Sequence, residues 1–399
     1  MQPIQQILPN LYWVGGNDRR LSRFENMHPL PNGITYNSYL LADEKTALID
    51  TVDVTVADQF TKNLEAALNG RALDYLIILH MEPDHCADME RLCQQYPNMK
   101  IVGNQKTLQF FNQFFSLDLG DRFIIVKEND ELSLGKQNLR FIMAPMVHWP
   151  EVMFCYESFN KVLYSADAFG SFGAFSGHLY ADEVDFEEQY LAEARRYYTN
   201  IVGKYGPQVQ AALKKVADLP IEMICALHGP IWRKNIEFYI DKYDHWSRYE
   251  PEEKGIVIAY GSMYGNTEHV ANLLATRLAE RSFPSIRMYD VSNTHASYII
   301  ADFFRYSHLV LAAPTYNMDL YLPMGGLLHD MSVLNIQNRK AAVIANGSWA
   351  PAAHNIMSAG LEKLKNVELV AEPMVIRSAF KPEQEPELEA IVEALCNSL

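Results

Sequence analysis

The stretch "HMEPDHCADME", residues 80–90, follows the apolar run "YLIIL" at residues 75–79. Its first six positions form the pattern H-x-E-x-D-H, which offers four potential metal ligands: His80, Glu82, Asp84 and His85. The pattern falls in a loop expected between a strand at 75–79 and a helix at 86–96. Alternate residues of such a loop can point to opposite sides, and one metal ion would not need four donors. The stretch therefore predicts a site for two metal ions.

Further ligands would have to come from distant strand-to-loop junctions. His148 stands in "APMVHWPE", Asp167 in "LYSADAFG" and His228 in "ALHGP", while Asp50 ends the run "ALID". Taken singly, such a histidine is more often a hydrogen-bonded structural residue, and Asp167 could be a turn or a helix cap. The four-ligand loop favours a metal-binding role for these residues, because two metal ions would need further ligands. A rigid sheet can direct the residues at its strand ends toward one point.

The rest of the first half alternates strand-like and helical runs. The expected strands are 36–43, 46–50, 75–79, 123–126, 139–144, 153–157 and 161–167, and the expected helices are 58–69, 86–96 and 184–200. The polar stretch "HWSRYEPEEKG" at 245–255 then reads as a linker. We therefore expect two domains, residues 1–250 and 251–399, with sheets covered by helices in the first.

The second half has the rhythm of repeated strand–helix units. The expected strands are 255–260, 285–291, 308–314 and 340–347, and the expected helices are 266–281 and 386–399. Units of this length predict a parallel, doubly wound α/β sheet.

A loop suited to a phosphate follows the first of these strands. It reads "GSMYGNT", residues 261–267, and leads directly into a helix. Hydroxyl groups, small residues and a helix N-terminus suit one phosphate, with Ser262, Asn266 and Thr267 as natural donors. The loop is neither a Walker A loop nor a GxGxxG loop, and a glycine-rich turn that binds nothing is the alternative.

Two later loops favour a bound ligand. "PTYNMDLYLP" at 314–323 and "NGSWAPAA" at 346–353 lie at carboxyl ends of strands, where open α/β sheets bind ligands, and their aromatic residues could flank a flat ring. The three loops together resemble the flavodoxin family. That resemblance implies FMN, bound by Ser262, Met263, Tyr264, Gly265, Asn266, Thr267, Pro314, Thr315, Tyr316, Asn317, Asn346, Gly347, Ser348 and Trp349.

Bulk properties limit the classes of partner and the compartment. The chain has 399 residues and a formal charge of −15, which argues against binding nucleic acid or an anionic membrane. Its five cysteines form no CxxC pair, which is typical of reduced thiols. The start does not read as a signal peptide, and no apolar run approaches a membrane span. We expect a cytoplasmic protein that acts on small substrates or protein partners.

The metal-ligand pattern resembles that of the metallo-β-lactamase-like fold, whose hydrolases hold zinc with H-x-H-x-D-H. Here Glu82 takes the place of the second histidine. With the order of the later ligands and the flavodoxin-like second half, essentially the whole chain resembles the flavodiiron protein family. The resemblance implies an α+β domain, an αββα sandwich, followed by a flavodoxin-like α/β domain. It also implies two irons, one held by His80, Glu82 and His148, the other by Asp84, His85 and His228, with Asp167 bridging.

That resemblance implies an oxidoreductase that reduces O2 to water, NO to N2O, or both. Electrons would pass through FMN from a separate donor, such as rubredoxin or a reduced flavin, deazaflavin or nicotinamide-linked donor. It further implies a head-to-tail homodimer or a dimer of dimers. His178 in "FSGHLY" is a candidate pocket residue or proton donor, although a surface or core histidine is the simpler interpretation.

Two other functions stay open from sequence alone. One is a zinc-dependent hydrolase of the lactamase-like fold with an accessory flavodoxin domain. The other is an electron carrier whose first half only docks a partner. A flavin domain has little reason to be fused to a redox-silent zinc site, so the sequence favours iron. Cys86, beside the ligands, is expected to be a small buried apolar residue at a helix start.

Overall fold

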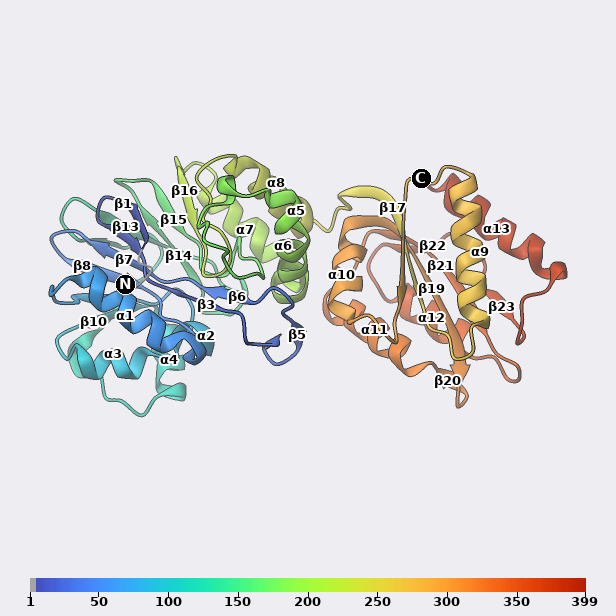
Figure 1. The fold of residues 1–399 in the computed structure, drawn as a ribbon, viewed down its shortest axis with the longest axis horizontal. Helices are drawn as coiled ribbons and strands as arrows, with labels where there is room; N and C mark the ends of the chain where they lie inside the picture. The colour runs from blue at the N-terminus through green and yellow to red at the C-terminus, as the bar shows by residue number, and fades with distance from the viewer. Residues whose placement is uncertain (1–4) are drawn as a thin grey trace. The chain divides into compact units, whose positions relative to one another are not determined.

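The structure is a computed structural model that describes residues 5–399. The chain divides into two compact units, Met1–Asp244 and His245–Leu399 (Figure 1). No helix within residues 5–399 combines the length and apolarity that crossing a bilayer requires.

Two sheets form the centre of the first unit. The larger has the strand order β1 (Gln5–Leu8), β2 (Leu11–Trp13), β7 (Tyr39–Ala42), β8 (Thr46–Ile49), β9 (Tyr75–Ile77), β10 (Lys100–Gly103) and β11 (Phe123–Ile125). The other has the order β12 (Glu131–Ser133), β13 (Asn138–Met143), β14 (Met153–Glu157), β15 (Val162–Tyr164) and β16 (Met223–Cys225). Both sheets are mixed, and every residue of β8 and β14 is buried. Strands so enclosed need cover on both faces.

Helices provide the outer layers of this unit. Figure 1 shows α1 (Ala57–Leu68), α3 (Met89–Gln95) and α4 (Gln105–Phe114) beside the first sheet, and α6 (Leu191–Tyr197), α7 (Gly206–Val216) and α8 (Ile236–Ser247) beside the second. Two short ribbons complete the unit, β3 (Gly16–Asp18) with β6 (Ile34–Tyr36) and β4 (Arg23–Phe24) with β5 (His28–Pro29). The expected αββα sandwich is confirmed.

The expected single helix at 86–96 was wrong. The chain forms the short helix α2 (Pro83–Cys86), breaks, and continues as α3. Pro83 occupies the first helical turn, where its missing N–H costs nothing. Asp84 and His85 therefore stand on a helical turn instead of a loop, and Cys86 ends this turn instead of starting a helix. The expected helix 184–200 is likewise broken, into α5 (Phe186–Gln189), α6 and the π-turn η4 (Tyr198–Val202).

The second unit is built on a sheet whose parallel strands have the order β18 (Ser285–Asp290), β17 (Glu253–Tyr260), β19 (Tyr306–Tyr316) and β21 (Arg339–Asn346), edged by β22 (Val367–Leu369) and β23 (Met374–Ile376). This 2-1-3-4-5 order is that of a flavodoxin-like fold. The short strand β20 (Asp319–Leu320) pairs antiparallel with β19. The sequence pattern predicted no element in residues 348–385, where the structure has α12 (Ala353–Glu362), β22 and β23.

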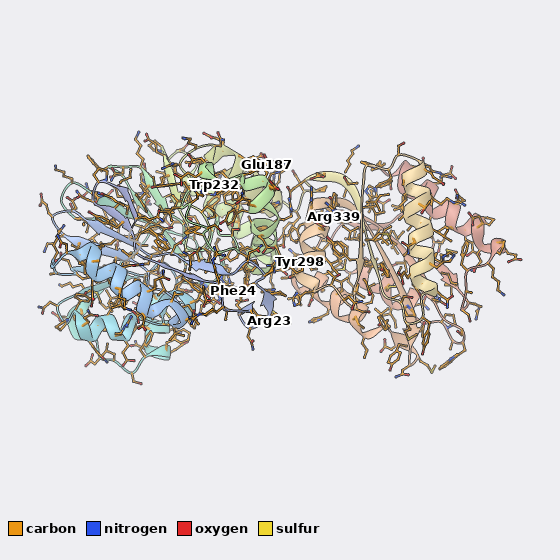
Figure 2. All side chains as sticks on the ribbon, in the orientation of Figure 1. Arg23, Phe24, Glu187, Trp232, Tyr298 and Arg339 are labelled. Carbon is orange, nitrogen blue, oxygen red and sulfur yellow. The ribbon has the colours of Figure 1, made fainter. Side chains whose placement is uncertain are left out.

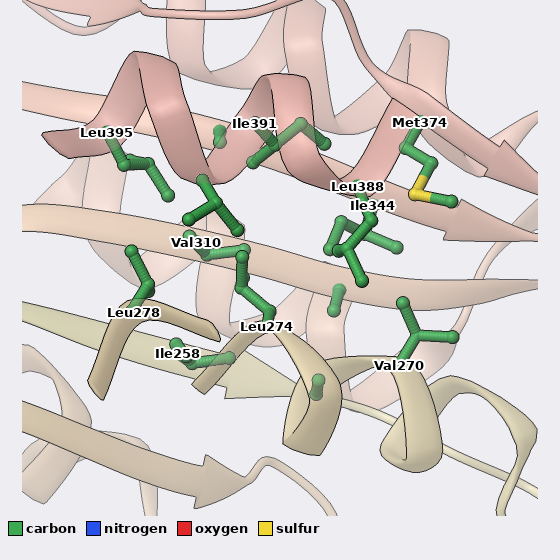
Figure 3. Packing of buried hydrophobic residues seen from close by; sticks show 14 of the residues in the cluster. Ile258, Val270, Leu274, Leu278, Val310, Ile344, Met374, Leu388, Ile391 and Leu395 are labelled. Atoms are coloured by element: carbon green, nitrogen blue, oxygen red, sulfur yellow. The ribbon is translucent and has the colours of Figure 1, made fainter. Parts of the chain in front are cut away.

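Helices cover both faces of this sheet. Figure 1 shows α9 (Asn266–Glu280) and α13 (Glu385–Asn397) together on one face, and α10 (Ala296–Arg305), α11 (Leu322–Val333) and α12 on the other. Figure 3 shows Leu274 and Leu278 of α9 and Ile391 and Leu395 of α13 around Val310 of the central strand β19, and Leu388 of α13 beside Ile344 of β21. Each such fully buried side chain stabilises the fold by about 1.5–3 kcal/mol. This packing fixes the carboxyl ends of the strands, from which the candidate ligand loops emerge.

Candidate functional site

Seven side chains of the first unit meet as two adjoining groups, and all seven are among the predicted ligands. The potential ligand atoms within each group lie within 4.8 Å of one another; the groups are His80, Glu82, His148 and Asp167, and Asp84, His85 and His228. No member is more than 8% exposed. His80 to His85 form one stretch that runs from the end of β9 into α2, and the other three residues follow β13, β15 and β16. Four segments far apart in the chain therefore supply one buried cluster.

Asp167 faces both groups with its two carboxylate oxygens. Its Oδ1 lies 3.1 Å from His85 Nε2, and its Oδ2 lies 3.1 Å from His148 Nε2. Within the first group, Glu82 Oε2 lies 3.0 Å from His148 Nε2. Within the second, Asp84 Oδ2 lies 3.2 Å from His228 Nε2. Asp167 thus has the geometry of a bridging ligand, with the Nε2 atoms turned toward each centre.

The cluster fits two cations. Both carboxylate oxygens of Asp84, Nε2 of His85 and of His228, and Oδ1 of Asp167 are buried without a hydrogen-bond partner. Orphaned buried polar atoms are rare in proteins, and those that converge on one point suit metal ions. The mixed imidazole and carboxylate donors are also compatible with iron.

The electrostatics of the cluster point the same way. Burial would lower the pKa of His148, but hydrogen bonds with Asp167 and Glu82 raise it to about 9. Burial would raise the pKa of Asp167, yet the charge of His85 and a hydrogen bond with His148 hold it well below its ordinary value. The Asp167 carboxylate is therefore ionised and attracts positive charge.

A surrounding layer of acceptors orients the histidines. Glu151, which is 1% exposed, accepts hydrogen bonds at Oε1 from His80 Nδ1 (2.7 Å) and from the Met81 backbone N–H (2.9 Å). The carbonyl of Thr35 lies 2.7 Å from His228 Nδ1. Such partners fix the ring so that Nε2 faces the metal.

The role of Glu151 was not found from the sequence, although it stands three residues after His148. Asp50 was noted only as a strand end, and its Oδ1 accepts hydrogen bonds from the backbone N–H groups of Leu79 and His80. The signal in the sequence for both Glu151 and Asp50 is an acidic residue beside an apolar, strand-like stretch. Such a residue must find a partner when it is buried.

A cavity of about 440 Å³, here called the mouth cavity, opens beside the ligands. It is lined by residues 21–26, Tyr36, Asp53 and residues 82–84. The Phe24 and Tyr36 rings lie 5.4 and 5.6 Å from the His228 ring, and Figure 2 labels Phe24 beside Arg23 on β4. Burial and the neighbouring Glu82 carboxylate raise the pKa of Glu25 to about 8. The sequence analysis did not find this cavity.

His178 stands apart from the cluster. Its side chain is 59% exposed, and its Nδ1 lies 3.6 Å from Glu183 Oε2. Among the described residues it belongs neither to the two ligand groups nor to the lining of the mouth cavity. These observations favour the surface histidine over the pocket residue.

A second cavity lies at the carboxyl ends of the strands in the second unit. Twelve of the fourteen residues predicted to bind FMN line it, all except Gly265 and Tyr316. Gly265 instead shapes the phosphate loop with φ 87°, and its N–H donates to Ser262 Oγ. Met318 and Ser378 also line the cavity and were not predicted.

The lining of this cavity suits a flavin with a phosphate arm. The N-terminus of α9 supplies the phosphate end, since Asn266 and Thr267 open that helix and line the cavity. Trp349 is 67% exposed and Tyr264 is 91% exposed, so both rings are free to cover a flat ligand. Thr315 Oγ1 accepts hydrogen bonds from the Ala352 and Ala353 N–H groups and ties the second loop to the start of α12.

Each of the two units matches a different protein family. Residues 34–229 match the ODP family beta lactamase, and residues 258–367 match flavodoxin. The anaerobic nitric oxide reductase flavorubredoxin of Vibrio vulnificus (strain YJ016) is 32% identical over 346 residues, which are 85% of this chain and 69% of that protein. The chain belongs to the flavodiiron protein family. An uncharacterized protein of Methanocaldococcus jannaschii, MJ0732, is 31% identical over 91% of this chain and 89% of its own length.

Solved structures of this family agree over the full length. The rubredoxin oxygen:oxidoreductase from Desulfovibrio gigas superposes with a TM-score of 0.93 at 26% identity, over 99% of this chain and 98% of that chain. The flavodiiron protein from Giardia intestinalis has the same fold, with a TM-score of 0.94 at 24% identity over 100% and 97% of the two chains. This flavodiiron protein is therefore an oxidoreductase with an FMN-binding flavodoxin domain and a diiron-type site, which confirms the predicted cofactors.

Proposed function

We propose that this flavodiiron protein reduces O2 to water, NO to N2O, or both, with electrons that enter through FMN. The observation that carries the proposal is the buried cluster with Glu82 in the second position and Asp167 between the two ligand groups. One relative is named as a nitric oxide reductase and one solved structure as a rubredoxin oxygen:oxidoreductase, so both substrates occur among similar proteins.

The proposed ligand assignment follows the two groups. His80, Glu82 and His148 would hold one iron, Asp84, His85 and His228 the other, and Asp167 would bridge them. When bound, the irons and FMN supply one-electron and two-electron redox chemistry. The protein's part is to hold these ligands rigidly, through Glu151 and the Thr35 carbonyl, and to keep the cluster away from bulk water.

The mouth cavity is the proposed entrance for the substrate. Its lining residues Phe24 and Tyr36 place aromatic rings against His228, while Arg23, Glu25 and Asp53 add charged groups to the lining. Glu82 and Asp84 line the same cavity, which brings the substrate to both ligand groups at once. A small neutral molecule such as O2 or NO suits an entrance lined by carboxylates better than an anion does.

We place the diiron domain in residues 1–250, the FMN domain in residues 251–399, and the protein in the cytoplasm, where its five free cysteines stay reduced. The FMN contacts would come from the three predicted loops. The electron donor would be a separate molecule, such as rubredoxin or a reduced flavin, deazaflavin or nicotinamide-linked donor; one similar solved structure is named as a rubredoxin oxygen:oxidoreductase.

We also propose a head-to-tail homodimer or a dimer of dimers. Exposed large apolar side chains occur beside both sites: Met27 and Val54 next to residues that line the mouth cavity, and Met263, Tyr264, Met318 and Trp349 at the FMN cavity. Apolar rims of this kind mark interaction surfaces. Forced monomers should keep both cofactors yet lose turnover, and full activity of a demonstrated monomer would contradict this arrangement.

The deciding experiment measures cofactors and turnover on the same sample. Iron, zinc and FMN are quantified, and the protein is reduced anaerobically and mixed in a stopped-flow instrument with O2 or NO. We expect two irons and one FMN per chain and reoxidation by at least one of the gases. Bound zinc, no gas consumption and cleavage of an ester or thioester would instead support the hydrolase, and which gas reacts faster decides the substrate.

A further inference from the structure

A fourth loop borders the FMN cavity, beyond the three that resemble flavodoxin. It follows β23, and its residue Ser378 lines the cavity together with the predicted residues. The stretch that matches flavodoxin ends at residue 367, before this loop begins.

The side chain of Asn346 clamps this loop from the end of the neighbouring strand β21. Asn346 Oδ1 accepts a hydrogen bond from the Ser378 N–H (3.1 Å), and Asn346 Nδ2 donates to the Ser378 carbonyl (3.0 Å). The Gly347 N–H adds a bond to the Ile376 carbonyl (3.0 Å). Asn346 is buried, so these bonds are shielded from water.

Ser378 is held in a conformation that serines rarely adopt. Its φ is 68°, in the left-handed region, although its side chain is exposed. A residue other than glycine persists there only when its surroundings impose it, and such residues cluster at ligand sites. The clamp by Asn346 supplies that constraint and directs the Ser378 hydroxyl, which donates to Ser348 Oγ (2.9 Å). The two hydroxyls thus form a pair on one wall of the cavity.

The position of this pair along the ligand follows from its two connections. Asn346 Nδ2 also lies 3.4 Å from Thr267 Oγ1, at the helix N-terminus that suits the phosphate. Ser348 directly precedes Trp349, the exposed ring of the third loop. Ser378 is therefore tied to the phosphate end through Asn346 and to the ring end through Ser348. Between phosphate and ring, FMN carries its ribityl chain, whose hydroxyls both donate and accept hydrogen bonds.

We propose that the Ser378–Ser348 hydroxyl pair binds the ribityl hydroxyls of FMN, and that Asn346 is the positioning residue that joins this contact to the phosphate loop. The inference rests on the proposed FMN function and adds a binding residue to it. It also changes the role of Asn346, because both ends of its side chain amide are engaged by protein groups.

The test compares three flavins on the full-length protein freed of its flavin, with binding followed by flavin fluorescence. FMN has the ribityl phosphate, riboflavin lacks the phosphate, and lumiflavin lacks the whole chain. In Ser378→Ala the Kd of FMN and of riboflavin should rise about fivefold, as expected for one neutral hydrogen bond, while that of lumiflavin stays unchanged. Ser282→Ala is the matched control, since Ser282 is also exposed with φ 56° but does not line the cavity.

The Asn346→Ala variant tests the positioning role. It should weaken FMN and riboflavin more than Ser378→Ala does, with lumiflavin affected least, whereas a general collapse of the site would weaken all three flavins alike. An equal loss for lumiflavin in Ser378→Ala, or no loss for any flavin, would overturn the inference. If the wild-type protein binds no FMN, the proposed function itself fails, whatever Ser378 does.

Discussion

The diiron site and the FMN site of this protein are built in opposite ways. The first consists of charged or ionisable side chains that are almost completely buried, and a further layer of acceptors such as Glu151 holds them in place. The second is a cavity lined by loops, with aromatic side chains such as Tyr264 largely exposed. A buried charged site is costly without its ions, whereas an open polar cavity is not. Loss of a side chain should therefore affect the first site far more than the second.

Removal of the bridging carboxylate should have the largest effect. In Asp167→Ala both ligand groups lose the carboxylate oxygen that faces them. We therefore expect fewer than one iron per chain and a turnover reduced by more than about a hundredfold. Residues that only orient metal ligands typically cost about 10- to 100-fold, so this loss should be larger. FMN content should stay normal. Iron is measured by a colorimetric assay and FMN by absorbance.

Asp53→Asn is the matched control for this change. Asp53 lines the mouth cavity beside the ligands Glu82 and Asp84 but belongs to neither ligand group. It should retain two irons per chain. Two irons retained by Asp167→Ala would show that the bridging assignment is wrong.

Loss of the Glu151 charge should have the next largest effect. Glu151→Gln keeps the size of the side chain but weakens the acceptor behind His80, so iron affinity or turnover should fall about 10- to 100-fold. Glu157→Gln is the control, because Glu157 is equally buried but accepts the Phe159 and Asn160 N–H groups instead. Competition with a chelator measures the affinity. An equal loss of iron affinity in both variants would show that Glu151 has only a structural role.

The two residues also show what the sequence could and could not provide. The ligands His80 to His85 are contiguous and follow a strand, so their chemistry and their place in the fold could both be predicted. The partnership of Glu151 with His80 depends on the loop between β13 and β14 returning to the end of β9, which no local pattern records. The mouth cavity was missed for the same reason, since it depends on Glu25 and Asn26 adopting positive φ.

The FMN site divides in a similar way. Its three predicted loops each follow a recognisable strand, and they contribute most of the cavity lining. Ser378 follows β23, which has only three residues, Met374–Ile376, and was not predicted. A strand this short carries too little periodicity to be recognised. The loop after β23 reaches the cavity because β23 pairs with β21.

A pH series on the iron-free protein should sharpen the contrast between the sites. His148 has its pKa raised from 6.5 to about 9 in the folded protein, so its protonated form stabilises the fold fully below pH 6.5. That stabilisation is lost as pH rises from 6.5 through about 9 and amounts to at most about 3 kcal/mol. Thermal unfolding of the iron-free protein should therefore occur at lower temperature at pH 9 than at pH 6.5.

Iron-loaded protein should lack this decline, because the metal replaces the proton on His148. The decline should be smaller in the iron-free His148→Asn variant, in which His80 and His228, whose pKa values are also raised, still contribute. An unchanged decline in this variant would assign it to those other groups. Flavin affinity offers the comparison: none of the residues that line the FMN cavity is Asp, Glu, His, Lys or Arg. We therefore expect the contribution of the protein to FMN binding to stay level over the same range.

The smallest effect is expected from the exposed ring of the third loop. Trp349→Ala should raise the Kd of FMN about 2- to 10-fold, as expected for one aromatic contact, because the other lining residues remain. Trp349→Phe should restore most of the affinity, and neither variant should change the iron content. Fluorescence titration measures the Kd. A loss of FMN binding in Trp349→Ala as large as the loss of iron in Asp167→Ala would mean that the flavin site, too, depends on single residues. The contrast between the buried metal cluster and the flavin cavity would then no longer hold.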